Sequence, residues 1–193
     1  SVQGLREGDV IVSGAAHASH AVIDAAPSPT FVHGDLRQPM ARVPAGLAVE
    51  LAPFAKMAEI AITAVRAAHF SLGSKVLVTG LGMVGNLAAQ CFQLAGAEVM
   101  ATDVLPFRLE RAKACGVARA IHSGEVDLEQ AVMDWTAGRG ADVVVESVGL
   151  SELIVQAIGL ARRLGQVILL GTPRRKAMLN PTPAFWKAHM NGI

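Results

Sequence analysis

Three glycines in the run GLGMVG, residues 80–85, constrain the fold of this 193-residue chain more than any other feature. The run directly follows Lys75–Thr79, an apolar, β-branched segment typical of a strand buried on both faces. It leads into a segment in which apolar residues recur at helical spacing, namely Val84, Leu87, Ala88, Cys91 and Ala95. The sequence therefore predicts a strand, a tight glycine turn and a helix that begins within the turn.

The segments after residue 50 alternate between strand and helix patterns. Further strands are predicted at Glu98–Thr102, Asp142–Glu146 and Gly165–Leu170, with a weaker one near Ala118–Ile121. Helices are predicted at Pro53–Ala68, from Pro106, from an Asp127 cap to Gly138, and from a Ser151 cap to Arg163. Such alternation produces right-handed βαβ units, so we expect an α/β fold with a doubly wound parallel sheet.

The first 50 residues have a different pattern. Short β-like segments occur at Asp9–Val12 and Ala21–Ile23, and a loop rich in proline and glycine follows. We therefore predict two parts: a β-rich part over residues 1–50 and a dinucleotide-binding domain over residues 51–193.

Each glycine of the loop has a physical role in such a domain. Gly80 allows a sharp turn off the strand, and Gly82 lets the backbone approach a pyrophosphate. Gly85 lets the helix pack closely on the sheet. Free N–H groups at the helix start, near Met83 and Val84, favour phosphate oxygens. The alternative is a plain strand–helix turn without a ligand.

Asp103 ends the next predicted strand, 18 residues beyond Gly85. A carboxylate there can accept hydrogen bonds from the adenosine ribose, and it would repel the 2′-phosphate of NADP. The sequence therefore favours NAD over NADP as the cofactor. Arg108 is a nearby cation that can line the ribose or tolerate a phosphate. The alternative for Asp103 is a turn residue or a helix cap.

Two further strand ends, residues 146–149 and 170–173, should face the same crevice, since ligands of parallel sheets bind at the carboxyl ends of strands. Val148 is predicted to pack on the cofactor. Leu170 and Thr172 are predicted to offer backbone groups to the nicotinamide carboxamide. Ordinary turns are the alternative for these residues.

The composition excludes several other classes of protein. The net charge is +1 and no basic patch is evident, so nucleic acid is not an expected partner. The apolar runs are too short to cross a membrane, and residues 1–8 lack the features of a signal peptide. Cys91 and Cys115 are not spaced as a metal or redox motif and are expected to be reduced thiols. These features predict a cytoplasmic protein.

Three stretches resemble the medium-chain dehydrogenase/reductase superfamily, in particular its zinc-type alcohol, polyol and threonine dehydrogenase branch. They are residues 75–121 (KVLVTGLGMVGNLAAQCFQLAGAEVMATDVLPFRLERAKACGVARAI), 138–149 (GRGADVVVESVG) and 164–174 (LGQVILLGTPR). Residues 42–66 resemble the segment by which that family leaves its catalytic domain and enters its cofactor domain. The resemblance covers most of the chain from about residue 40.

The resemblance implies a six-stranded Rossmann domain and hydride transfer between a small-molecule alcohol and NAD. It also implies that residues 1–50 are a remnant of the β-rich, GroES-like catalytic domain. The family's zinc-binding Cys and Gly-His-Glu motif, and its last sheet strand, do not occur in this sequence. We therefore expect a fragment, with zinc only in a full-length protein that is a homo-oligomer.

Two other functions fit the same loop. One is a zinc-free, NADPH-dependent quinone or enoyl reductase of the same superfamily, and the other is a nucleotide-binding module without catalysis. As metal ligands, Glu59 is a candidate only in a longer protein, where the resemblance places a ligand nearby. His17 and His20 lie three apart in a β-like segment, which argues against shared ligation.

Overall fold

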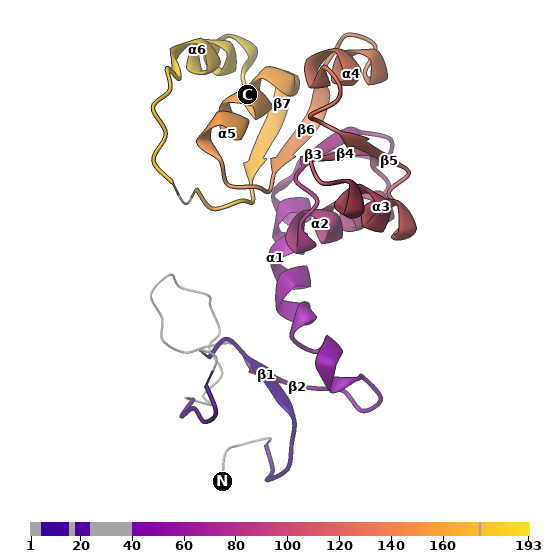
Figure 1. Cartoon of the computed structure of the whole chain (residues 1–193), viewed down its shortest axis with the longest axis vertical. Helices are drawn as coiled ribbons and strands as arrows, with labels where there is room; N and C mark the ends of the chain where they lie inside the picture. Colours follow the sequence, from indigo (N-terminus) through magenta and orange to yellow (C-terminus); the bar gives the residue numbers. More distant parts are fainter. Residues whose placement is uncertain (1–4, 16–17, 24–39, 174) are drawn as a thin grey trace. The chain divides into compact units, whose positions relative to one another are not determined.

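The computed structural model describes residues 5–15, 18–23, 40–173 and 175–193 (Figure 1). The chain forms two compact units, which divide between Lys56 and Met57. The smaller unit contains an antiparallel pair, β1 (Ile11–Ser13) and β2 (Met40–Arg42), followed by the short 3-10 helix η1 (Val49–Leu51). This small antiparallel sheet agrees with the β-rich part expected at the start of the chain.

One predicted strand of this unit is wrong. Ala21–Ile23 is not in a strand, and the side chain of Val22 is fully exposed. A β-like residue pattern forms a strand only where a second strand satisfies its backbone N–H and C=O groups, and no such partner occurs in the described residues. Ala18–His20 is likewise not a strand, and His17 lies outside the described residues.

The larger unit is built on a parallel sheet of five strands in the order β5-β4-β3-β6-β7. Their bounds are β3 (Lys75–Thr79), β4 (Glu98–Asp103), β5 (Arg119–His122), β6 (Ala141–Glu146) and β7 (Ala161–Leu169). The chain starts at the central strand β3, runs outward to β5, and then crosses to β6 on the other side of β3. The strand order therefore reverses between β3 and β6, which is the point where such sheets bind ligands.

Helices cover both faces of this sheet (Figure 1). On one face, helices α1 (Phe54–Ala67), α2 (Met83–Leu94) and α3 (Pro106–Ala114) contribute residues to a core with Val76 and Val78. On the other face, α4 (Leu128–Trp135) and α5 (Ser151–Leu160) pack around Leu77. Helix α6 (Thr182–Asn191) packs against α5. Successive residues of β3 thus face opposite cores, which confirms the doubly wound Rossmann fold.

The end of α5 differs from the sequence prediction. The helix stops at Leu160, three residues before the predicted end, and Ser151 is its first residue rather than its cap. Ala161 pairs with Ala141 of β6, and the guanidinium of Arg162 forms an ion pair with Asp142. These sheet contacts override the helical pattern of residues 161–163. The predicted cap Asp127 is confirmed, since its carboxylate accepts from the Gln130 N–H at 3.1 Å.

Candidate functional site

The glycine loop leaves the carboxyl end of β3 and is shaped by two of its three glycines. Gly80 has φ of +89°, a left-handed conformation that favours glycine, and its N–H donates to the Thr102 carbonyl at 2.8 Å. A Cβ on Gly85 would lie 1.9 Å from the Gly80 carbonyl oxygen. Gly80 is therefore required by the turn, and Gly85 by the close approach of α2 to the loop.

Gly82 differs from both, because no atom beyond its two chain neighbours lies within 4 Å of where its Cβ would be. Its φ of −61° is open to any residue, so neither packing nor backbone conformation demands glycine. Gly82 precedes the first residue of α2 and gives no side-chain cap to the helix. The N–H groups of the first helical turn have no partner within the helix. Open space beside free donors is an arrangement that accepts a phosphate.

Asp103 lies next to this cradle at the end of β4. Its carboxylate is nearly buried and links the two neighbouring loops: Oδ2 accepts from the Leu81 N–H at 2.7 Å, and Oδ1 accepts from the Leu105 N–H at 2.9 Å. Oδ2 also pairs with Nη1 of Arg108 at 3.2 Å. Asp103 therefore shapes the turn before α3, which agrees with the alternative interpretation of Asp103 as a turn residue. The same carboxylate also contacts the glycine loop through the Leu81 N–H.

The carboxylate of Asp103 can still accept a hydrogen bond, which suits it to a ribose hydroxyl. A carboxylate offers about four lone-pair sites, and the contacts of Asp103 use three of them. The Arg108 side chain is 39% exposed, so its contact can be exchanged for one with a ligand. Asp103 and Arg108 can thus serve hydroxyl groups placed beside Leu81.

The turn after β6 approaches the glycine loop from the other side. The Ser147 hydroxyl lies 2.8 Å from each of the Thr79 and Gly80 carbonyl oxygens, and a Cβ on Gly80 would lie 2.5 Å from Cγ2 of Val148. Val148 is 46% exposed, so it is available to a ligand at the edge of the sheet. The structure therefore brings Val148 to the glycine loop, while its predicted packing on the cofactor stays a prediction.

The turn after β7 packs on the turn after β6. The N–H groups of Leu170 and Gly171 both donate to the Glu146 carbonyl at 2.8 Å. Leu170 is partly buried against the core, whereas Thr172 is exposed. The predicted site residues thus lie where β3, β4, β6 and β7 end or in the first turn of the helix that follows, all on one edge of the sheet.

Sequence reasoning missed one residue of this edge, the side chain of Glu146. It is completely buried, and its carboxylate accepts hydrogen bonds from the N–H groups of Val148 and Gly149. A signal was present in the sequence, since an acidic residue ends the otherwise apolar run of residues 143–146. A carboxylate in that position must be compensated within the fold.

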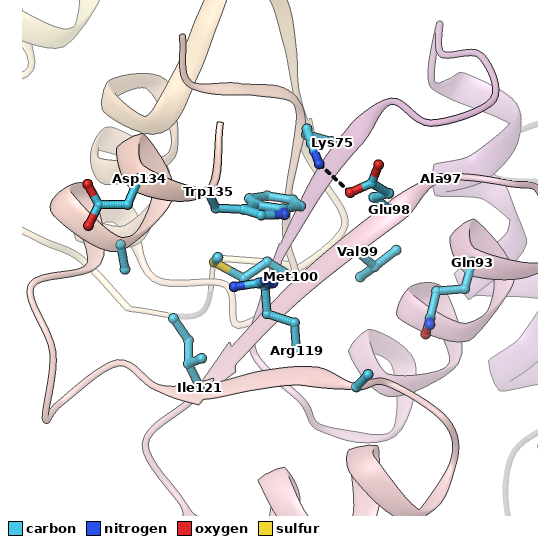
Figure 2. Close-up of a pocket in the computed structure, with 12 residues that line it drawn as sticks. Lys75, Gln93, Ala97, Glu98, Val99, Met100, Arg119, Ile121, Asp134 and Trp135 are labelled. Atoms are coloured by element: carbon cyan, nitrogen blue, oxygen red, sulfur yellow. Dashed lines mark hydrogen bonds and ion pairs between the residues drawn. The ribbon is translucent and has the colours of Figure 1, made fainter. Parts of the chain in front are cut away.

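The opposite, amino-terminal edge of the sheet carries a hollow of about 850 Å³ (Figure 2). It lies where β3, β4 and β5 begin, and Trp135 and Met100 line it. At its rim, Lys75 forms an ion pair with Glu98 and its ammonium lies 5.4 Å from the centre of a Trp135 ring. None of the predicted cofactor residues lines this hollow.

The metal candidates from the sequence form no metal site within the described residues. In the described part of the chain, no three His, Cys, Asp or Glu residues come together as a metal site. Glu59 lies on an exposed position of α1, and Nδ1 of His20 lies 3.3 Å from the hydroxyl of the neighbouring Ser19. No helix in the described residues combines the length and the apolar character needed to span a bilayer.

A family model described as zinc-binding dehydrogenase matches residues 83–193, more than half of the chain. The chain belongs to this family. The match confirms the resemblance to zinc-type medium-chain dehydrogenases, and it assigns residues 83–193 to the NAD(P)-binding domain of that family.

Individual relatives agree with this assignment. L-Threonine 3-dehydrogenase of Photobacterium profundum is 31% identical over 152 residues, which are 76% of this chain and 43% of that protein. Sorbitol dehydrogenase of Halalkalibacterium halodurans is 38% identical over 101 residues, 51% of this chain and 29% of that protein. The solved structure of alcohol dehydrogenase TADH from Thermus sp. ATN1 has 27% identity and a TM-score of 0.70, covering 79% of this chain and 45% of that one. The chain spans less than half the length of these relatives.

Proposed function

We propose that residues 51–193 bind NAD(H) as the cofactor domain of a zinc-type alcohol or polyol dehydrogenase. The observation that carries the proposal is the open space at Gly82, where the protein itself gives no reason for a glycine. A pyrophosphate fills such a space and accepts from the free N–H groups at the start of α2. The residues present thus fit a dinucleotide.

The strand order sets the direction of the cofactor. With the pyrophosphate at the loop after β3, the ribose contact of Asp103 draws the adenosine half over β4. The nicotinamide half would then lie on the side of β6 and β7. Val148 would pack against it, and backbone groups of Leu170 and Thr172 would bind the carboxamide.

The same carboxylate favours NAD over NADP. Asp103 is nearly buried and is held by the backbone of Leu81 and Leu105, so it cannot move far from a 2′-phosphate. Two negative groups in a site of low polarity repel each other strongly. Arg108 pairs with Asp103, and one guanidinium shared with that carboxylate offsets the charge of a 2′-phosphate only in part.

The nicotinamide supplies the hydride-accepting carbon when the cofactor is bound. The residues of this chain bind and orient the cofactor, and their contribution is therefore positional. In the proposed full-length enzyme, a catalytic domain of which residues 1–50 are a part would hold zinc, and zinc would there supply polarisation of a small-molecule alcohol. Assembly of that enzyme into homo-oligomers in the cytoplasm is part of the same proposal.

Calorimetric titration of the 193-residue protein with NADH and NADPH tests the cofactor preference. We expect NADH to bind at least about tenfold more tightly, equivalent to about 1.4 kcal/mol. Asp103→Ala should weaken NADH binding and reduce or reverse this preference, because both the ribose acceptor and the repulsive charge are lost.

Other results of that titration, and an activity assay of a full-length protein, distinguish the two alternative functions. Tighter binding of NADPH by the unsubstituted protein would instead favour the zinc-free quinone or enoyl reductase. A full-length protein that binds NADH, yet oxidises no alcohol with NAD, would favour the non-catalytic module. Binding of neither nucleotide would overturn the proposal.

A further inference from the structure

Glu146, the last residue of β6, is a carboxylate with 0% exposure that pairs with no cation among the described residues. Burial of a charge is costly unless hydrogen bonds compensate it. The compensation comes from the backbone of the following turn. Oε1 accepts from the N–H groups of Val148 at 2.8 Å and Gly149 at 2.9 Å, and Oε2 lies 3.1 Å from the latter nitrogen. The carboxylate thereby fixes the conformation of residues 147–149.

The backbone of Glu146 holds the turn after β7 in the same way. Its carbonyl oxygen accepts from Leu170 and Gly171, each at 2.8 Å. The two turns also touch directly, since a Cβ on Gly149 would lie 2.4 Å from the Thr172 carbonyl oxygen. Glu146 is therefore the common acceptor of two turns that form one unit.

We infer that Glu146 is a positioning residue that presets these two turns for the nicotinamide half of the cofactor. The inference rests on the proposed function, which places the adenosine half over β4 and the nicotinamide half over β6 and β7. Glu146 is buried and acts through Val148, Leu170 and Thr172, whose positions it fixes. Charge-assisted hydrogen bonds to backbone N–H groups are stronger than neutral ones, which suits a carboxylate to this task.

Titration of the 193-residue protein with NADH and with ADP tests this role. ADP carries the adenosine and the pyrophosphate without the nicotinamide half. We expect Glu146→Ala to weaken NADH binding at least about tenfold and to change ADP binding by less than about threefold. Glu146→Gln should recover most of the NADH affinity, because its amide oxygen can accept from the same two N–H groups.

A second variant keeps the test decisive if Glu146→Ala does not fold. Gly149→Ala disturbs the same pair of turns through the contact with Thr172, and it should show the same selective loss of NADH. Equal losses of NADH and ADP affinity in either variant, or unchanged NADH affinity, would overturn the inference. If the unsubstituted protein binds ADP and NADH, the results for the Glu146 and Gly149 variants leave the proposed function untouched. If the unsubstituted protein binds neither nucleotide, the proposed function itself fails.

Discussion

The two edges of the parallel sheet are built differently, although the same strands contribute to both. At the carboxyl edge, glycines and backbone N–H groups lie close together. The acidic side chains of Asp103 and Glu146 are buried there, and both accept hydrogen bonds from backbone N–H groups. At the amino edge, charged side chains pair with one another around an open hollow, as Lys75 does with Glu98. The hollow is thus at the edge that carries none of the predicted cofactor residues. Convergence of polar groups, rather than the presence of a hollow, marks the candidate site.

The largest effect that we expect at the carboxyl edge is on folding. Gly85→Ala places a methyl group 1.9 Å from the Gly80 carbonyl oxygen, so loop and helix must separate. We expect a loss of about 3 kcal/mol in the free energy of unfolding, at the upper end for overpacked sites. Urea unfolding followed by circular dichroism measures this loss.

Gly82→Ala is the matched control for that measurement, because it adds the same methyl group three residues earlier in open space. Its free energy of unfolding should stay equal or rise by about 0.5 kcal/mol, since alanine restricts the unfolded chain. Equal destabilisation by the two substitutions would contradict the contrast between close packing at Gly85 and open space at Gly82.

The smallest effect concerns the amino edge. Arg119 begins β5 and lines the hollow (Figure 2). The glycine loop follows the other, carboxyl end of the parallel strands. We expect Arg119→Ala to change NADH affinity by less than about twofold, because no proposed cofactor contact involves this edge. A loss of tenfold or more in the same calorimetric titration would place the cofactor elsewhere and remove the contrast between the edges.

The sequence predicted those parts of the fold that depend on local pattern. Strand β3 was predicted to the residue, since its apolar, β-branched run is bounded by a charged residue and a glycine. The end of α5 was missed because the pairing of Ala161 with Ala141 is a tertiary contact that helical periodicity does not contain. The predicted strand at Ala21–Ile23 failed for the same reason, as strands depend on partners.

The candidate site could likewise be predicted only as far as local sequence pattern determines it. Gly80, Gly82 and Asp103 could be assigned to one edge of the sheet from the sequence, because they lie at or just after strand ends and strand ends of a parallel sheet meet at one edge. The role of Glu146 depends on its burial and on the approach of two turns, which spacing alone does not reveal. The contact of Asp103 with Leu81 joins residues 22 apart and likewise emerges only from the fold.

The most direct test of the account is the NADH affinity of Gly82→Ala. The matched control is Gly159→Ala in α5, where a Cβ also meets no atom within 4 Å beyond its chain neighbours and the backbone of its own helix. We expect Gly82→Ala to fold like the unsubstituted protein and to bind NADH at least about tenfold more weakly, because the methyl group occupies the space of the pyrophosphate. Gly159→Ala should bind NADH as the unsubstituted protein does. Unchanged NADH affinity in Gly82→Ala would contradict the assignment of this cradle as the cofactor site.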